Sequence, residues 1–294
     1  MPPDRAGNCP KGPLVVEINM NFALKSLVAA AAIASIGAAN AASVVTNVGA
    51  SNTIAGNSLT LTGGTGTLSF SSTLIEALNA AKTTVASVAP ATVTETSVFD
   101  PELEENVRVS SKASAPISSV TQDNITGAVL SVATTGGALM TSPKNSGVSL
   151  GGTLQVTNLN VDLSSKRIYA SITGNFTGAA TGVAGTSGGA ITTINSFYLW
   201  DYAAISGPTT VTTGGTYANL ITGLKITDAG FNHFVSALRL QTTGINALRA
   251  VTDFGTIASS ISVTSAPAVP EPSTYALMGL GLVGIALAAR RRAK

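Results

Sequence analysis

One stretch in the middle of the chain constrains the fold more than any other. Residues 152–162 and 167–174 alternate between apolar and polar side chains, and residues 163–166 form a short polar turn between them. The apolar set on one face is Leu154, Val156, Leu159, Val161, Ile168, Ala170 and Ile172. A period of two is typical of a strand buried on one side, so we predict an antiparallel hairpin. The alternation slips near Asn158, which is compatible with a β-bulge there.

Strand patterns recur along most of the chain. Residues 57–71 predict a second hairpin whose turn is Gly63-Gly64-Thr65-Gly66. Further strand-like segments lie at residues 91–98, 125–133, 147–159, 191–202, 209–223 and 255–263. By contrast, residues 106–124 are polar and only weakly patterned.

Three segments have helical periodicity. Residues 73–85 begin with Thr73 and Glu76 at the spacing of a capping box. Residues 229–240 have an apolar stripe and a cap at Thr227 or Asp228, and residues 243–251 form a shorter helix. We therefore predict a mainly β domain, an antiparallel sandwich or barrel-like structure with two or three short helices.

The composition excludes several kinds of protein. Charged residues are 10% of the chain, while Val, Ile and Leu are plentiful, which favours a β-rich secreted domain over a disordered one. The net charge of +2 owes much to a C-terminal arginine cluster, so the body has no basic patch for nucleic acid. Cys9 is the only cysteine and His233 the only histidine. We expect no disulfide, no metal and no cofactor in the body.

The C-terminus contains three elements in a fixed order. First comes Val269-Pro270-Glu271-Pro272-Ser273, where the prolines remove backbone donors and favour extended geometry. Next, residues 275–289 form an uncharged apolar run, which as a helix of roughly 22 Å is short for a hydrocarbon core of about 30 Å. Last comes the basic tail of residues 290–294, with Arg290, Arg291 and Arg292, which should stay cytoplasmic. We predict a short transmembrane helix held between a processing motif and a basic stop.

This arrangement resembles the PEP-CTERM sorting signal of Gram-negative bacteria. The resemblance implies cleavage near the Pro-Glu-Pro motif by an exosortase, a membrane-embedded transpeptidase-like enzyme, followed by release or transfer to the cell surface. Members of this group are commonly associated with exopolysaccharide and with biofilm or floc formation. The logic parallels that of other C-terminal signals whose hydrophobic tail is removed from the mature protein.

The N-terminal part has the pattern of an export signal. A lysine and an apolar stretch follow Met20, and Ala39-Asn40-Ala41 is a small-x-small cleavage site that would leave Ala42 first. Residues 1–19 fit no signal, so we interpret them as a misassigned start; a long n-region containing Arg5 and Lys11 is the alternative.

These features divide the chain into segments. The predicted boundaries are a start extension (1–19), a signal peptide (20–41), a β-rich secreted domain (42–263), a linker (264–269) and a sorting signal (270–294, with its motif at 270–273). The body would be exported through the inner membrane, held there transiently by the C-terminal helix, and then reach the cell surface or the medium.

Residues that could support chemistry are few. Residues 185–189 match a nucleophile elbow around Ser187, with Asp228 and His233 following in hydrolase order, but the elbow requires a strand before it and a helix after it. The acidic residues Asp100, Glu102, Glu104 and Glu105 could hold Ca²⁺, although no EF-hand spacing is present. A sugar-stacking platform or a core cluster could be formed by Tyr169, Tyr198, Trp200 and Tyr202. We assign no catalytic residue.

The body is also similar to secreted β-rich domains of the HtaA haem-binding type. The similarity rests on Gly151-Gly152, on Thr157-Asn158-Leu159 with Val161-Asp162, and on the late helix-strand unit. It implies a haem ligand, for which only a tyrosine or His233 could serve. Three classes follow: a non-enzymatic surface or matrix protein, which we favour, a secreted binding domain for haem, Ca²⁺ or carbohydrate, and a secreted hydrolase.

Overall fold

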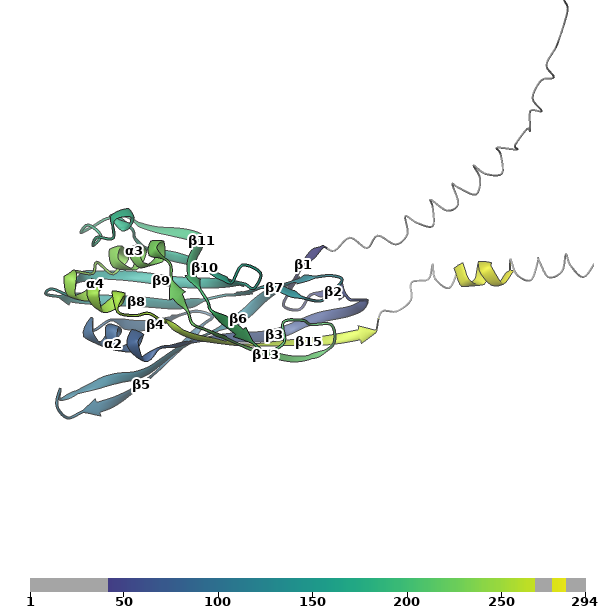
Figure 1. The fold of residues 1–294 in the computed structure, drawn as a ribbon, viewed down its shortest axis with the longest axis horizontal. Helices are drawn as coiled ribbons and strands as arrows, with labels where there is room; N and C mark the ends of the chain where they lie inside the picture. Colours follow the sequence, from purple (N-terminus) through teal and green to yellow (C-terminus); the bar gives the residue numbers. More distant parts are fainter. Residues whose placement is uncertain (1–41, 268–276, 284–294) are drawn as a thin grey trace, which may run out of the picture. The chain divides into compact units, whose positions relative to one another are not determined.

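The computed structural model describes residues 42–267 and 277–283. Residues 42–267 form a mainly β domain in which all strand pairs are antiparallel, as predicted (Figure 1). The strands are β1 (Ser43–Asn47), β2 (Ser51–Ile54), β3 (Asn57–Phe70), β4 (Thr84–Val88), β5 (Thr92–Asp100), β6 (Glu105–Asp123), β7 (Val129–Thr134), β8 (Gly137–Asn145), β9 (Ser149–Asp162), β10 (Arg167–Asn175), β11 (Ile191–Asp201), β12 (Ala204–Ser206), β13 (Gly215–Thr222), β14 (Lys225–Ile226) and β15 (Gly255–Pro267).

One continuous path joins the strands, in the order β12-β13-β15-β3-β6-β7-β9-β10-β11-β14. Strand β6 connects the two halves of this path: residues 112–116 pair with β3, and β7 pairs farther along, from Ile117 to Gln122. The sequence prediction missed β6 as a strand. Its partners and its buried side change along its length, so no single apolar face marks it.

The hairpin predicted within residues 57–71 is wrong, because β3 runs straight through the glycines. Gly64 pairs with Ile261 of β15, and its φ of 158° is a value that L side chains rarely adopt. A Cβ at Gly64 would lie 2.3 Å from the Ser260 carbonyl oxygen. The glycine therefore permits close approach of two strands and does not mark a turn.

The predicted hairpin around residues 163–166 is confirmed. Asp162 pairs with Arg167 at the end of β9–β10, and the register shifts between Tyr169 and Ser171. Asn158 lies at this irregularity with a φ of 53°, and its backbone N–H donates to the Gly136 carbonyl at 2.9 Å. The slip near Asn158 is therefore a β-bulge.

Three α-helices accompany the sheet: α2 (Ser72–Ala80), α3 (Asp228–Ala237) and α4 (Thr242–Arg249). The predicted Thr227 cap of α3 is confirmed, since its hydroxyl accepts from the Gly230 N–H at 3.0 Å. For α2 the predicted capping box is wrong. Ser71 is the N-cap, accepting from the Leu74 N–H at 3.1 Å, and the helix ends well before residue 85 because Lys82 turns left-handed.

Two apolar cores lie along the domain. The larger contains Trp200, Phe234 and Phe254, whose ring centroids lie 6.3 Å (Trp200–Phe254) and 6.4 Å (Phe234–Phe254) apart. The smaller gathers Ile54 and Ile117 with other residues of β2, β3, β6, β7 and β15. Within the larger core, an apolar cavity of about 80 Å³ is left unfilled. A void of that size costs about 2 kcal/mol relative to a filled core.

Strand β15 ends later than predicted. Thr264 pairs with Thr60, and the pairing continues to Pro267 opposite Asn57. Most of the predicted linker at residues 264–269 therefore belongs to the sheet, because a Thr- and Ser-rich strand on the domain surface carries a weak apolar signal.

Candidate functional site

The first described residue, Ala42, is held to the domain by Asn124. The Ala42 N–H donates to Asn124 Oδ1 at 2.9 Å, and the Asn124 N–H donates to the Ala42 carbonyl at 3.0 Å. Asn124 follows β6 directly, and its own carbonyl accepts from the Ala55 N–H at 2.8 Å. Strand β1 thus starts from a fixed point at the predicted cleavage site.

The C-terminal end of β15 lies at the same end of the domain. Pro267 pairs with Asn57, and Asn57 pairs with Ile54 at the tip of β2–β3. The next residue, Ala55, is the one that binds Asn124. Both ends of the body therefore emerge beside the β2–β3 turn, as Figure 1 also shows. The sequence offered no signal for this, since Asn124 lies in a segment without a pattern.

The residues of the predicted sorting motif lie outside the described residues, as do Ala39, Ala41 and the basic stop: Val269, Pro270, Glu271, Pro272, Ser273, Arg290, Arg291 and Arg292. Within the predicted apolar helix 275–289, residues 277–283 are helical and exposed, including Leu277 and Leu280. In the described ranges, no helix is both long enough and apolar enough to cross a membrane.

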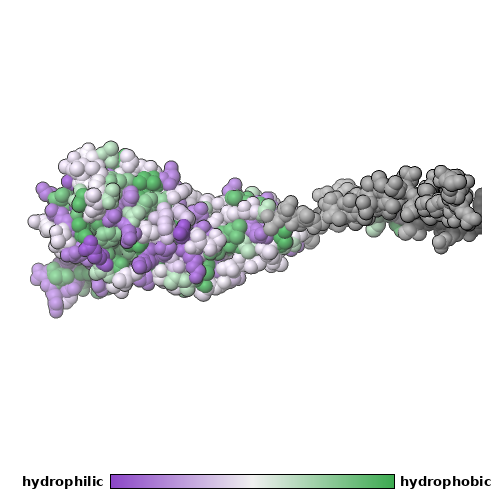
Figure 2. Space-filling view, turned by 45° about the horizontal axis from the view of Figure 1, so that its top comes forward, coloured by the Kyte–Doolittle hydropathy of each residue, from purple (hydrophilic) through white to green (hydrophobic). Residues whose placement is uncertain are grey.

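The β5–β6 hairpin projects at the end of the domain opposite Ala42 and Pro267 (Figure 1). Its tip exposes Phe99 and Leu103 together with the predicted acidic cluster. The carboxylates have separate partners and do not converge on one point. Asp100 accepts from the N–H of Glu102 at 2.8 Å, and Glu105 pairs with Lys82 at 3.3 Å. In Figure 2 the projecting tip at this end is hydrophilic, while the rest of the end mixes hydrophilic and hydrophobic residues.

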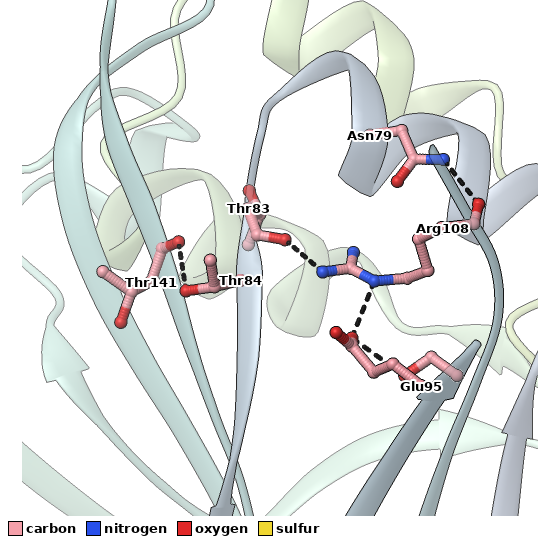
Figure 3. A network of polar contacts seen from close by, with 7 residues as sticks. Asn79, Thr83, Thr84, Glu95, Arg108 and Thr141 are labelled. Atoms are coloured by element: carbon pink, nitrogen blue, oxygen red, sulfur yellow. Dashed lines mark hydrogen bonds and ion pairs between the residues drawn. The ribbon is translucent and has the colours of Figure 1, made fainter. Parts of the chain in front are cut away.

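Arg108 joins the base of this hairpin to the neighbouring strand. Its Nε lies 2.7 Å from Glu95 Oε1 and forms an ion pair with it, although the N–H direction does not meet the geometry of a hydrogen bond. Its Nη2 donates to the Thr83 carbonyl at 3.0 Å, and Asn79 Nδ2 donates to the Arg108 carbonyl at 2.8 Å. Figure 3 shows the guanidinium reaching from β6 toward β4 across the place where the strands diverge. The network is a structural link between α2, β4 and β5–β6.

An aromatic and charged face covers the outer side of β10 and β11. The rings of Tyr169 and Tyr198 lie 5.7 Å apart, and the Arg167 guanidinium lies 4.8 Å from the centroid of the Tyr198 ring. The Tyr198 hydroxyl donates to Asp201, and desolvation together with this carboxylate raises the pKa of Tyr198. Asp201 is paired in register with Arg167 on one side and Lys225 on the other, so these side chains share one face.

Trp200 and Tyr202 do not belong to this outer face. Ile168 pairs with Trp200, and the next residue, Tyr169, pairs with Tyr198. Leu199 has no partner in this register and is the extra residue of a β-bulge. Leu199 and Trp200 are consequently both buried, and so is Tyr202, where burial and the charge of Asp162 raise the pKa. Of the four predicted aromatic residues, only Tyr169 and Tyr198 form a platform.

A groove of about 620 Å³ adjoins the edge of this face at Lys225. Asp228, Phe231 and Asn232 of α3 and Arg249 of α4 line it, with the Arg249 guanidinium 5.6 Å from the Phe231 ring centroid. Aromatic rings beside cations, amides and a carboxylate suit sugars.

The residues of the predicted triad do not assemble. Ser187 is exposed in the loop after β10, and His233 Nδ1 contacts the Ala229 carbonyl at 2.7 Å on its own helix. The His233 ring packs against Phe176 and Phe197, with centroids 4.8 and 4.6 Å away. Across residues 42–267, no hydrogen bond joins Ser187, Asp228 and His233.

Comparison with known families identifies the C-terminus. The model of the PEP-CTERM protein-sorting motif matches residues 268–292, which begin directly after β15. The predicted sorting signal is therefore confirmed. No curated protein matches the chain.

Two solved structures from Corynebacterium glutamicum are weakly similar to the chain. The C-terminal domain of HtaA is 12% identical, with a TM-score of 0.38, covering 70% of this chain and 99% of that domain. The heme-binding protein HtaB is 12% identical, with a TM-score of 0.39, covering 77% of this chain and 98% of its own. A likeness of this size implies no shared ligand.

Proposed function

We propose that this chain, which carries a PEP-CTERM sorting motif at residues 268–292, is an exported surface or extracellular-matrix protein processed by an exosortase. The motif itself is the observation that supports the proposal. Cleavage near Pro270 and Pro272 would separate the β body from the apolar helix. Until then the helix would hold the body at the outer face of the inner membrane.

The position of the chain ends favours this topology. Ala42 and Pro267 both lie beside the β2–β3 turn, so cleavage of the export signal and cleavage at the sorting motif would take place at the same end of the domain. The opposite end, with the β5–β6 hairpin, and the outer face of β10 and β11 would stay accessible during and after processing.

We further propose that the body is not an enzyme and works by contact with exopolysaccharide. Tyr169 and Tyr198 expose ring surface beside Arg167, and the groove at Lys225 adds two more elements of the same chemistry, a phenyl ring and a guanidinium. Paired aromatic rings next to cations and carboxylates are the kind of surface that a sugar chain would recognise.

The sorting proposal is tested by measuring the molecular mass of the exported protein. The full chain is expressed in hosts with and without an exosortase, and the exported protein is analysed by intact mass spectrometry. With the enzyme, the residues beyond the motif should be lost, and a Pro270→Ala/Pro272→Ala variant should retain them. The proposal fails if residues 273–294 persist on the mature surface form in the host that has the enzyme.

The polysaccharide contact has a separate test, which is retention of the exported protein on the producer's purified exopolysaccharide. Tyr198→Ala should weaken binding roughly tenfold, equivalent to about 1.4 kcal/mol. Ile191→Ala is the matched control, since Ile191 is exposed on the same strand without an aromatic ring. Equal retention of both variants would exclude the Tyr198 face as the contact.

A further inference from the structure

An apolar cavity lies within the main core. Its volume is about 80 Å³, and it lies among β3, β6, β8, β9, β11 and β15. Two smaller cavities of about 30 Å³ adjoin it: one shares Gly66 and Val161 with it, and the other shares Leu74 and Met140. The core therefore contains three adjoining cavities, whereas protein cores are normally close-packed.

Small residues create this space. The wall contains Gly66, Ala91, Ala113, Ala115 and Ala138, at positions where larger residues would fill the core, while Gly137 is required by the close approach of the Val156 carbonyl. Gly66 has an ordinary φ, and a Cβ there would meet only Thr134 Cγ2 at 3.4 Å. A methyl group could therefore be accommodated at Gly66, and the chain leaves the position open.

One residue of the cavity wall has a buried polar atom without a partner. Trp200 lines the cavity and is 4% exposed, and its Nε1 has no hydrogen-bond partner. A buried N–H without a partner costs free energy, and a ligand with an acceptor would recover it. The other polar side chain of the wall, Thr134, already donates to the Leu159 carbonyl at 3.3 Å.

We infer that the main-core cavity binds a small apolar molecule that carries a single hydrogen-bond acceptor, which Trp200 Nε1 engages. Dry apolar cavities bind hydrocarbons, as an engineered cavity of about 150 Å³ binds benzene. The cavity here is about half that size and approaches it only together with the two neighbouring cavities, so it suits a slender unbranched chain of about five or six non-hydrogen atoms that extends toward them. This ligand is independent of the proposed sorting and of the polysaccharide face.

The test uses the full chain, in which Trp200 is the single tryptophan and therefore a fluorescence reporter of the cavity. The probes are 2-pentanone and pentane, which have similar chains but differ in the acceptor. We expect saturable changes in Trp200 emission, with 2-pentanone binding about fivefold more tightly than pentane. Unchanged emission up to the solubility limit of both probes would overturn the inference.

Two cavity-filling variants establish the location. Ala138→Val and the milder Gly66→Ala should each raise the melting temperature without probe and weaken probe binding, with circular dichroism reporting that each variant is folded. Ala86→Val is the control, because Ala86 is exposed on β4 and lies outside the cavity wall. If a folded filling variant binds 2-pentanone as well as the parent, the inference is wrong.

A third variant isolates the hydrogen bond. Trp200→Phe keeps an aromatic ring in the wall and removes Nε1. Thermal shift replaces fluorescence for this variant, and the preference for 2-pentanone over pentane should disappear. A preference that survives in Trp200→Phe would contradict the assigned role of Nε1.

Discussion

Ala42 and Asn124 exchange two hydrogen bonds at the start of the β body, one through the Asn124 side chain and one through its backbone. If cleavage leaves Ala42 first, its N–H becomes a charged amine facing Asn124 Oδ1. Asn124→Asp would then create an ion pair at this position.

We therefore expect Asn124→Asp to stabilise the processed form by up to about 1 kcal/mol. In the unprocessed chain Ala42 has a neutral amide N–H, and the substitution should bring no such gain. The check is the melting temperature of both forms at low and high salt. An equal effect on the two forms would argue against cleavage before Ala42.

Lys82 and Arg239 share an unusual backbone conformation but differ in what their side chains bind. Each stands in left-handed conformation just after a helix, with φ of 48° and 52°, where glycine is usual. The Arg239 side chain also donates to the carbonyls of Gly185, Leu150 and Gly151, whereas Lys82 makes one exposed ion pair.

The two glycine substitutions should consequently have opposite signs. Lys82→Gly relieves backbone strain and should raise the free energy of unfolding by about 0.5–1 kcal/mol. Arg239→Gly loses three hydrogen bonds and should lower it by about 1–3 kcal/mol. Urea unfolding measures both, and a stabilising Arg239→Gly would show that these bonds are of no consequence.

The Arg108 network predicts a cost for removing its guanidinium. Arg108→Met removes the donor of the Thr83 carbonyl and leaves Glu95 with only the Ser111 hydroxyl at 3.4 Å, so it should lower the free energy of unfolding by about 1–3 kcal/mol. Lys82→Met, which breaks the exposed pair with Glu105, should change it by about 0.5 kcal/mol or less. Similar losses in the two variants would mean that Arg108 behaves as an ordinary surface residue.

Stability should depend on pH through Asp162. Burial acts to raise its pKa, but hydrogen bonds from the hydroxyls and N–H groups of Ser164 and Ser165 prevail and hold the pKa below its ordinary value. A lowered folded-state pKa gives stability that is present above the unfolded pKa of about 3.9 and is lost as the pH falls through the folded value.

Asp162→Asn should therefore melt at a lower temperature than the parent at neutral pH, and the difference should narrow in acid. Melting curves between neutral pH and about pH 2 measure it. A constant difference at every pH would show that the carboxylate charge has no part in holding the turn.

Local patterns predicted the elements that depend on local interactions. The β9–β10 hairpin, the bulge near Asn158 and the Thr227 cap follow from alternation and from side chains that bond to nearby backbone. Strand β6 was missed because its partners and its buried side change along its length, so it has no single alternating pattern.

The sequence by itself determined the sorting motif, the antiparallel β class and the late helices, because each is encoded by neighbouring residues. Only the tertiary structure decided that Gly64 lies inside a strand, that Leu199 turns Trp200 into the core, and that Ala42 and Pro267 share one end of the domain. Those outcomes depend on which strands pair across long separations in the sequence and on how closely their backbones approach. The spacing of residues along the chain predicts neither of these.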